Sequence, residues 1–141
     1  CDLYSYSAYD IIHYARNDPA KGKVKFRAAL DYIASKLPAS AAFGEKNLYI
    51  GEFGWPEVRS DQDAEASTAQ SLNVIRTTVE TALEWGCPYV VYWQVYDNEV
   101  RVKDRRPTND EVRGFYLVKP DGSHAAAWDY FASLLGPARA K

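Results

Sequence analysis

The residue with the clearest chemical potential is Glu52, which follows an apolar run and stands between Gly51 and Gly54 in the stretch LYIGEFGWPE, residues 48–57. Glycine at position 51 permits close backbone approach, and glycine at position 54 permits the positive φ of a tight turn. Such glycines position a side chain, but they also serve plain turns. A lone Glu at a strand end is more often a surface or ion-paired residue, so a structural and a chemical role both stay open at this point.

Two aromatic residues end other strand-like runs in a comparable place. Alternation along a regular strand puts Leu48, Ile50 and Glu52 on one face, with Glu52 at the carboxyl end. Trp93 lies near the carboxyl end of a later run, and Tyr9 lies just past the end of the first one. Each aromatic residue alone is more often a packing residue. In βα barrels, however, the carboxyl ends of the strands carry the active site, so the three residues are predicted to converge on one mouth.

The elements that must position these residues alternate between strand and helix. Strand-like runs rich in Tyr, Val and Ile span residues 2–7, 47–52 and 89–94. Apolar residues at steps of three and four predict three helices, containing Phe26, Leu30, Ile33 and Leu37; Ala69, Leu72, Ile75, Val79 and Ala82; and Ala127, Trp128, Phe131 and Leu134. This repetition predicts an α/β fold with a parallel sheet and right-handed crossovers.

Start and stop residues set the limits of the first two helices. Pro38 is predicted to stop the first helix. Asp61 and Asp63 stand at the start of the second, and Gly86, followed by Pro88, is its expected C′ residue.

The long stretch 95–123 interrupts the βα repetition before the last helix. Within it, Phe115 to Val118 followed by a turn at Pro120-Asp121-Gly122 predicts a short hairpin. Ser123 is predicted to cap the last helix, and Gly136-Pro137 to end it.

Three βα units do not close a fold, because a parallel sheet needs both faces and its edges covered. A complete βα barrel takes about 250 residues, and this chain has 141. We therefore expect residues 1–141 to be part of a (β/α)8 TIM barrel, with three βα units and a hairpin insertion before the last helix. The alternative is a subunit that completes itself with partners. A first residue other than Met favours a fragment, and the compartment of the parent protein stays unknown.

Composition and motifs argue against several functional classes. A net charge of −2 argues against a nucleic-acid surface, and no apolar run approaches the roughly 20 residues of a membrane span. The scattered His and Cys residues lack zinc spacing, and Cys1 and Cys87 are expected to be ordinary thiols. GEFGWPE has neither a dinucleotide nor a phosphate-loop pattern, which argues against an unrelated βα enzyme such as a nucleotide binder.

The same residues resemble a known family, the glycoside hydrolases of clan A, which include cellulase- and mannanase-like barrels. YIGEFGWPE resembles their seventh strand, VVYWQVYDNE (90–99) their eighth, and DLYSYSAYD (2–10) their sixth. The tail RGFYLVKPDGSHAAAWDYF is similar to the segment that closes these barrels. The resemblance covers nearly the whole chain and implies that it is the carboxyl-terminal part, strands six to eight, of such a barrel, from a secreted or periplasmic enzyme.

The resemblance also implies roles for individual residues. Glu52 matches the catalytic nucleophile, Tyr9 the tyrosine that hydrogen-bonds and orients it, and Trp93 the sugar platform at the cleavage point. Trp55 is either a further platform or a loop-packing residue. Ser7 stands at a substrate-binding position where the family usually has His, and a Ser can donate a hydrogen bond but cannot carry imidazole charge. His13 would line the rim or stay an exposed loop residue.

The implied reaction is the retaining hydrolysis of a β-linked oligo- or polysaccharide by two carboxyl groups, without metal or cofactor. The family's acid/base is a Glu after Asn at the fourth strand, and no such pair fits here, since DNE at 97–99 follows the wrong strand. Asp97, Glu99 and Glu57 are the remaining acids near the predicted mouth. The chain alone is expected to be inactive or nearly so, completed by an amino-terminal barrel fragment or by further copies of itself. The alternative function is a non-catalytic carbohydrate-binding or oligomeric scaffold module.

Overall fold

A computed structural model describes residues 1–57, 63–96 and 114–136 of the chain. The fold is mixed α/β and divides into two compact units. The first unit comprises Cys1–Gly54 and Asn73–Trp93, and the second comprises Trp55–Leu72 and Gln94–Lys141.

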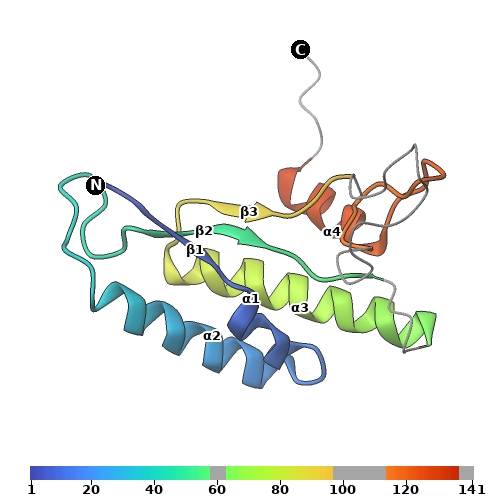
Figure 1. The fold of residues 1–141 in the computed structure, drawn as a ribbon, viewed down its shortest axis with the longest axis horizontal. Coiled ribbons are helices and arrows are strands. Elements are labelled where there is room, and N and C mark those ends of the chain that lie inside the picture. Colours follow the sequence, from blue (N-terminus) through green and yellow to red (C-terminus); the bar gives the residue numbers. More distant parts are fainter. Residues whose placement is uncertain (58–62, 97–113, 137–141) are drawn as a thin grey trace, which may run out of the picture. The chain divides into compact units, whose positions relative to one another are not determined.

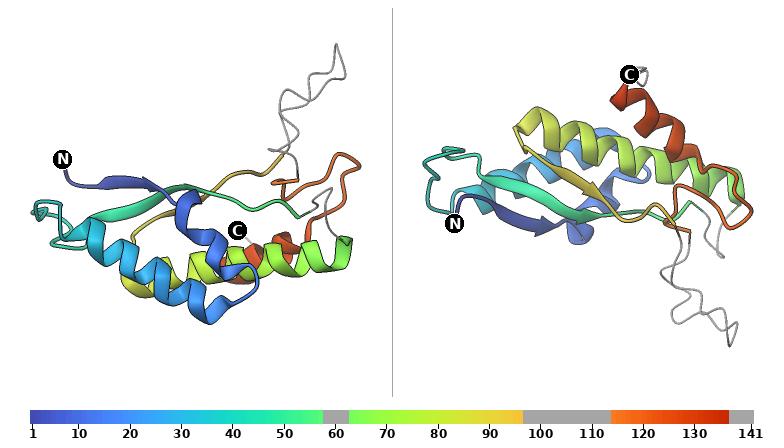
Figure 2. Two further views of the ribbon diagram at one scale, coloured as in Figure 1. Left: turned by 60° about the horizontal axis from the view of Figure 1, so that its bottom comes forward. Right: turned by 90° about the horizontal axis from the view of Figure 1, so that it is seen from above.

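The first unit is built on a parallel sheet of three strands in the order β1-β2-β3. These are β1 (Tyr4–Ser7), β2 (Leu48–Phe53) and β3 (Val90–Tyr92). Between β1 and β2 lie α1 (Tyr9–Ile12), the 3₁₀ helix η1 (His13–Ala15) and α2 (Pro19–Ala34); α3 (Ala64–Trp85) precedes β3. Helix α2 and the part of α3 in this unit lie on the same side of the sheet (Figure 1 and Figure 2). The predicted βα repetition and the small parallel sheet are confirmed.

The core of the first unit lies between the sheet and these helices. Leu48, Ile50 and Phe53 of β2 are at most 1% exposed, and so are Phe26 and Leu30 of α2. Burial of each such side chain contributes about 1.5–3 kcal/mol. The opposite, open face of the sheet carries Tyr89 and Val91, which are 57% and 48% exposed.

Helix α2 begins and ends at positions that local chemistry explains. The Asp18 carboxylate accepts the Lys21 N–H at 2.9 Å, and Pro19 occupies the first helical turn, where its missing N–H costs nothing. The α-helix ends at Ala34, earlier than the predicted Leu37. Residues 35–37 continue as tight turns instead, because Pro38 has no N–H to donate to the Ala34 carbonyl and its ring would clash with that carbonyl in an α-helix.

Both ends of α3 follow the predicted residues. The Asp63 carboxylate accepts the Glu65 N–H at 2.7 Å, while Asp61 lies outside the described residues. At the other end Gly86 has a φ of 110°, and the Cys87 N–H reaches the Ala82 carbonyl at 2.9 Å. This Schellman pattern confirms Gly86 as the C′ residue.

Cys1 and Cys87 are free thiols, as expected. Cys1 is exposed and Cys87 is buried. Burial raises the pKa of the Cys87 thiol to about 11, so it stays protonated at neutral pH.

The second unit contains the predicted hairpin. The Ala125 N–H bonds to the Leu117 carbonyl and the Lys119 N–H to the Ser123 carbonyl, both at 2.8 Å, and Val118 bridges His124 in antiparallel fashion. Residues 115–118 also hydrogen-bond to residues 94–95. Gln94 and Val95, which follow β3, are therefore paired with residues 115–118 within this unit.

The predicted Ser123 cap of the last helix is wrong. Helix α4 (Ala126–Leu135) has Ala125 at its N-cap position, and the Ala125 side chain makes no capping hydrogen bond to the helix. Ser123 lies before this N-cap position, and its hydroxyl donates to the Asp121 carboxylate at 2.7 Å within the turn. The Glu57 carboxylate, 69 residues earlier, accepts the Ala126 N–H at 2.6 Å instead. Gly136, with a φ of 69°, ends α4 as predicted.

Candidate active site

The structure brings Glu52 and Tyr9 together in the first unit. The Tyr9 Oη donates to Glu52 Oε1 at 3.0 Å, across 43 residues of sequence. Tyr9 is the first residue of α1, and the preceding Ala8, fully buried, donates its N–H to the Glu52 carbonyl at 3.0 Å. The end of β1 and the start of α1 are thus fixed to Glu52 by a backbone and a side-chain hydrogen bond.

Strand β2 carries a β-bulge at Gly51 and Glu52. On one side Tyr6 pairs with Ile50 but Ser7 pairs with Glu52, which leaves Gly51 as the extra residue. On the other side Ile50 pairs with Val90 and Phe53 with Tyr92, so that two residues oppose Val91 alone. Two residues facing one is the definition of a bulge.

The predicted orientation of Glu52 is wrong. Because of the bulge, the Glu52 side chain does not continue the line of Leu48 and Ile50. Phe53 takes the next buried position, at 0% exposure, and its ring contacts the ring of Tyr92 with centroids 5.4 Å apart. Glu52 is half-buried and lies beside the exposed Ser7, on the open face. Alternation gave the wrong face because it assumes a regular strand.

The two glycines beside Glu52 have different roles from each other. A Cβ at position 51 would lie 1.9 Å from the Ser5 Oγ, so the predicted close approach at Gly51 is confirmed. Gly54 is not among the glycines with positive φ, and the predicted left-handed turn there is wrong. The bulge, rather than a turn at Gly54, sets the direction in which Glu52 leaves the strand.

The Tyr9 phenol is held in its protonated form. Partial burial, the hydrogen bond to Glu52 and the negative charge of that carboxylate, in this order, raise the pKa of Tyr9 well above its usual value of 10. A phenol that keeps its proton donates a stable hydrogen bond to the carboxylate. Among the described residues Tyr9 is the only hydrogen-bond partner of the Glu52 side chain, which leaves Oε2 available for other chemistry.

A second tyrosine–carboxylate pair lies nearby in the sequence and was not predicted. The Tyr6 Oη donates to Asp10 Oδ1 at 2.5 Å, which joins β1 to the first turn of α1. Burial first, and then this contact, raise the pKa of the Tyr6 phenol. The i, i+4 spacing of the two residues was the available indication, but it has meaning only once a helix is placed there.

The other predicted site residues of the first unit lie close to the same strand ends. The Trp93 N–H donates to the Phe53 carbonyl at 2.8 Å, one residue beyond the paired Tyr92, and Trp93 is half-buried. Ser7 is exposed beside Glu52. His13 lies in η1 rather than in a loop, and its ring contacts that of Tyr14 with centroids 4.1 Å apart.

Trp55 belongs to the second unit. Its carbonyl accepts the Ser71 hydroxyl at 3.2 Å, which fixes the residue against α3. Its indole Nε1 is buried and has no hydrogen-bond partner among the described residues. The predicted loop-packing role agrees with the hydrogen bond of the Trp55 carbonyl, but it does not explain why the indole donor has no partner.

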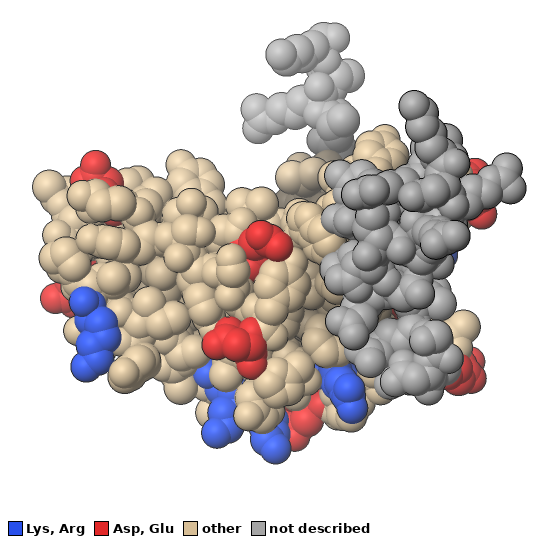
Figure 3. All heavy atoms as spheres, viewed as in Figure 1, with Lys and Arg blue, Asp and Glu red and all other residues tan. Residues whose placement is uncertain are grey.

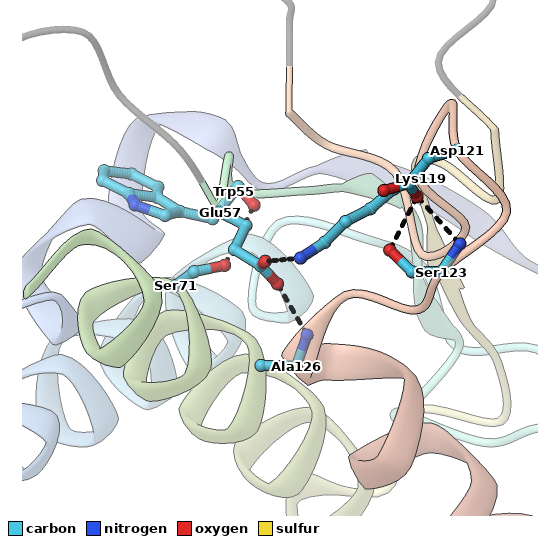
Figure 4. Close-up of polar contacts among 7 residues, drawn as sticks. All are labelled: Trp55, Glu57, Ser71, Lys119, Asp121, Ser123 and Ala126. Atoms are coloured by element: carbon cyan, nitrogen blue, oxygen red, sulfur yellow. Dashed lines mark hydrogen bonds and ion pairs between the residues drawn. The ribbon is translucent and has the colours of Figure 1, made fainter. Parts of the chain in front are cut away.

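Glu57, one of the remaining acids near the predicted mouth, has a structural role and is not the missing acid/base. Its side chain is 8% exposed, and its two oxygens contact Lys119 Nζ at 2.8 Å and the Ala126 N–H at 2.6 Å (Figure 4). Both oxygens are engaged inside the second unit, so the carboxylate is not free to deliver a proton to a substrate. Asp97 and Glu99 lie outside the described residues.

Charge on the surface is mixed. On the visible part of the face in Figure 3, wide neutral areas separate the charged side chains, and acidic and basic residues adjoin along the lower edge. The described part of the chain contains no group of three or more His, Cys, Asp or Glu residues that could hold a metal ion. It also contains no helix that is both long and apolar enough to cross a membrane.

Compared with known proteins, the chain matches no family model, no curated protein and no solved structure.

Proposed function

We propose that this chain is the carboxyl-terminal part of a retaining clan A glycoside hydrolase of the (β/α)8 type, with Glu52 as the nucleophile. The observation that carries this proposal is the 3.0 Å hydrogen bond from Tyr9 to Glu52 at the carboxyl ends of two neighbouring parallel strands. In α/β folds this end of the sheet is where ligands bind. A half-buried carboxylate with one oxygen oriented and the other available suits nucleophilic attack.

In the proposed reaction Glu52 attacks the anomeric carbon while the glycosidic bond breaks, which forms a covalent glycosyl-enzyme. The leaving oxygen takes its proton from a second carboxylic acid about 5–5.5 Å away, and water later releases the sugar. Tyr9 donates to Glu52 throughout and fixes the direction of the attacking oxygen. Trp93 would offer an apolar ring to the C–H face of the sugar, and Ser7 a hydroxyl to its polar edge.

The second carboxylic acid would come from further βα units of the barrel. Parallel sheets are almost always covered on both faces, yet Tyr89 and Val91 on the open face of this sheet are 57% and 48% exposed. This exposure supports a completed sheet in the active protein. The missing units would belong to the same polypeptide, to a complementing amino-terminal fragment or to further copies.

A second candidate function is a carbohydrate-binding module without catalysis. It is favoured by the finding that, in the described part of the chain, no second carboxylate contacts Glu52 or Tyr9. In that reading Tyr89, whose ring meets that of Tyr49 edge-on with centroids 6.3 Å apart, and Trp93 would form a sugar-binding surface.

Aryl glycosides with an acidic leaving group distinguish the two functions. Dinitrophenolate departs without protonation, so a site that holds only the nucleophile should still release it slowly from 2,4-dinitrophenyl β-glycosides. Glu52→Gln should abolish this release, and methyl β-glycosides should not react with either protein. If the wild-type chain releases no dinitrophenolate while it and Glu52→Gln bind oligosaccharides equally, the hydrolase proposal fails and the binding module stands.

A further inference from the structure

The contact between Ser5 and Gly51 has a consequence for the position of Glu52. In the bulge, Gly51 is the extra residue between the pairs Tyr6–Ile50 and Ser7–Glu52. We infer that Gly51 is a positioning residue: its missing side chain leaves room for the Ser5 hydroxyl, and this fit maintains the bulge that turns Glu52 onto the open face. The nucleophilic role of Glu52 rests on the proposed function, whereas its placement beside Tyr9 does not.

The fit between the two residues is close. A Cβ at position 51 would lie 1.9 Å from the Ser5 Oγ and 3.2 Å from the Ser5 Cβ. Rotation of the Ser5 hydroxyl would relieve the first contact but not the second. The strands cannot separate readily, since the Tyr4 N–H bonds to the Asn47 carbonyl at 2.8 Å below this point and the Ala8 N–H bonds to the Glu52 carbonyl at 3.0 Å above it.

The alternative to the bulge is a regular strand. Without the extra residue, Glu52 would follow Ile50 on the helix-covered face and Phe53 would point to the open face. Phe53 resists this change because it is fully buried and contacts Tyr92. The burial of Phe53 therefore requires the bulge, and Gly51 allows it to form.

The test is Gly51→Ala, compared with the double variant Ser5→Gly/Gly51→Ala in the full chain. Tyrosine ring NMR at pH 11 measures the ionised fraction of the Tyr9 phenol and so reports whether Glu52 lies beside it. The variant Tyr9→Phe assigns the Tyr9 resonance. A phenol with the usual pKa near 10 is about nine-tenths ionised at this pH, whereas Tyr9 beside Glu52 stays largely protonated. Tyr6 is the internal control, because its phenol donates to Asp10 of α1 and not to Glu52.

In Gly51→Ala we expect a larger fraction of Tyr9 to be ionised at pH 11 than in the wild type, because the hydrogen bond and the charge of Glu52 are lost while partial burial still raises the pKa of Tyr9. Tyr6 should stay as protonated as in the wild type. The double variant should restore protonated Tyr9, because it removes both atoms of Ser5 that the new methyl group would meet. If the ionised fraction of Tyr9 at pH 11 is the same in Gly51→Ala as in the wild type, the inference is wrong. If Gly51→Ala does not fold, the double variant decides. Its failure to fold, or a folded double variant in which Tyr9 is still more ionised than in the wild type, would show that the Ser5 contact is not what requires glycine at position 51. Dinitrophenyl glycoside turnover is measured separately, so failure of the proposed function is distinguishable from failure of this inference.

Discussion

The carboxylate of Glu57 holds α4 in the second unit. Replacement of Glu57 is therefore expected to lower the free energy of unfolding by an amount that the contacts of this carboxylate determine. The side chain is 8% exposed, contacts Lys119 Nζ at 2.8 Å and accepts the Ala126 N–H at 2.6 Å. Glu57→Gln keeps an acceptor for the helix but removes the charge that pairs with Lys119. Glu57→Ala removes both contacts.

The expected magnitudes follow from the burial of the pair. A hydrogen bond to a charged group contributes about 1.5–3 kcal/mol, and the Lys119 side chain is 30% exposed, so that its ammonium regains some hydration in the variant. We expect Glu57→Gln to lower the free energy of unfolding by about 1–2 kcal/mol. Glu57→Ala should cost about 3 kcal/mol, since it also leaves the first N–H of α4 without its cap. These losses lower the Tm by about 4 °C per kcal/mol in a chain of this size.

The assay combines urea denaturation followed by circular dichroism with amide hydrogen exchange at Ala126. Exchange at Ala126 should accelerate in Glu57→Ala and stay slow in Glu57→Gln. The matched control is Asp121→Asn, which removes an exposed carboxylate whose hydrogen-bond partner is Ser123 and should leave exchange at Ala126 unchanged. An unchanged unfolding midpoint together with unchanged Ala126 exchange in Glu57→Ala would refute the assignment of Glu57 as the remote cap of α4.

Three further predictions concern the first unit. Asp18→Ala removes the N-cap of α2 and should cost about 1 kcal/mol in urea denaturation; an unchanged midpoint would contradict the cap. Gly86→Ala forces a φ of 110° on a residue with a Cβ and should lower the midpoint by the equivalent of at least about 1 kcal/mol; a gain in stability would contradict the Schellman geometry. Because the folded chain raises the pKa of both Tyr6 and Tyr9, their contribution to stability is complete below pH 10 and declines as the pH rises further. The unfolding midpoint should therefore fall above pH 10, and less steeply in Glu52→Gln; equal slopes would contradict the coupling of Tyr9 to Glu52.

Much of the first unit could be predicted from the sequence because local patterns determine it. Apolar periodicity gave the helices, and Asp63 and Gly86 gave the limits of α3, since their side-chain and backbone chemistry acts within one turn. The order of strands, together with the known place of sites in βα folds, predicted that Tyr9 and Glu52 lie at the same end of the sheet, and the resemblance to clan A implied the hydrogen bond between them.

The features that were missed depend on contacts between distant residues. Alternation placed Glu52 in line with Ile50, but the register is set by the burial of Phe53 and the space beside Ser5, which no local pattern in β2 shows. The Ser123 cap was likewise wrong because Glu57, 69 residues before Ala126, supplies the acceptor. Caps and bulges formed by tertiary contacts leave no periodic trace in the sequence.

Covalent trapping tests the central claim that Glu52 is a nucleophile oriented by Tyr9. A 2,4-dinitrophenyl 2-deoxy-2-fluoro-β-glycoside has a leaving group that departs without an acid, and its fluorine slows release of the sugar from the protein. We predict that the intact mass of the chain increases by one fluoroglycosyl group and that peptide mapping places the group on Glu52. Glu52→Gln should gain no mass, and Tyr9→Phe should label more slowly than wild type. A folded wild-type chain that gains no mass, or that carries the sugar on another residue, would contradict the account.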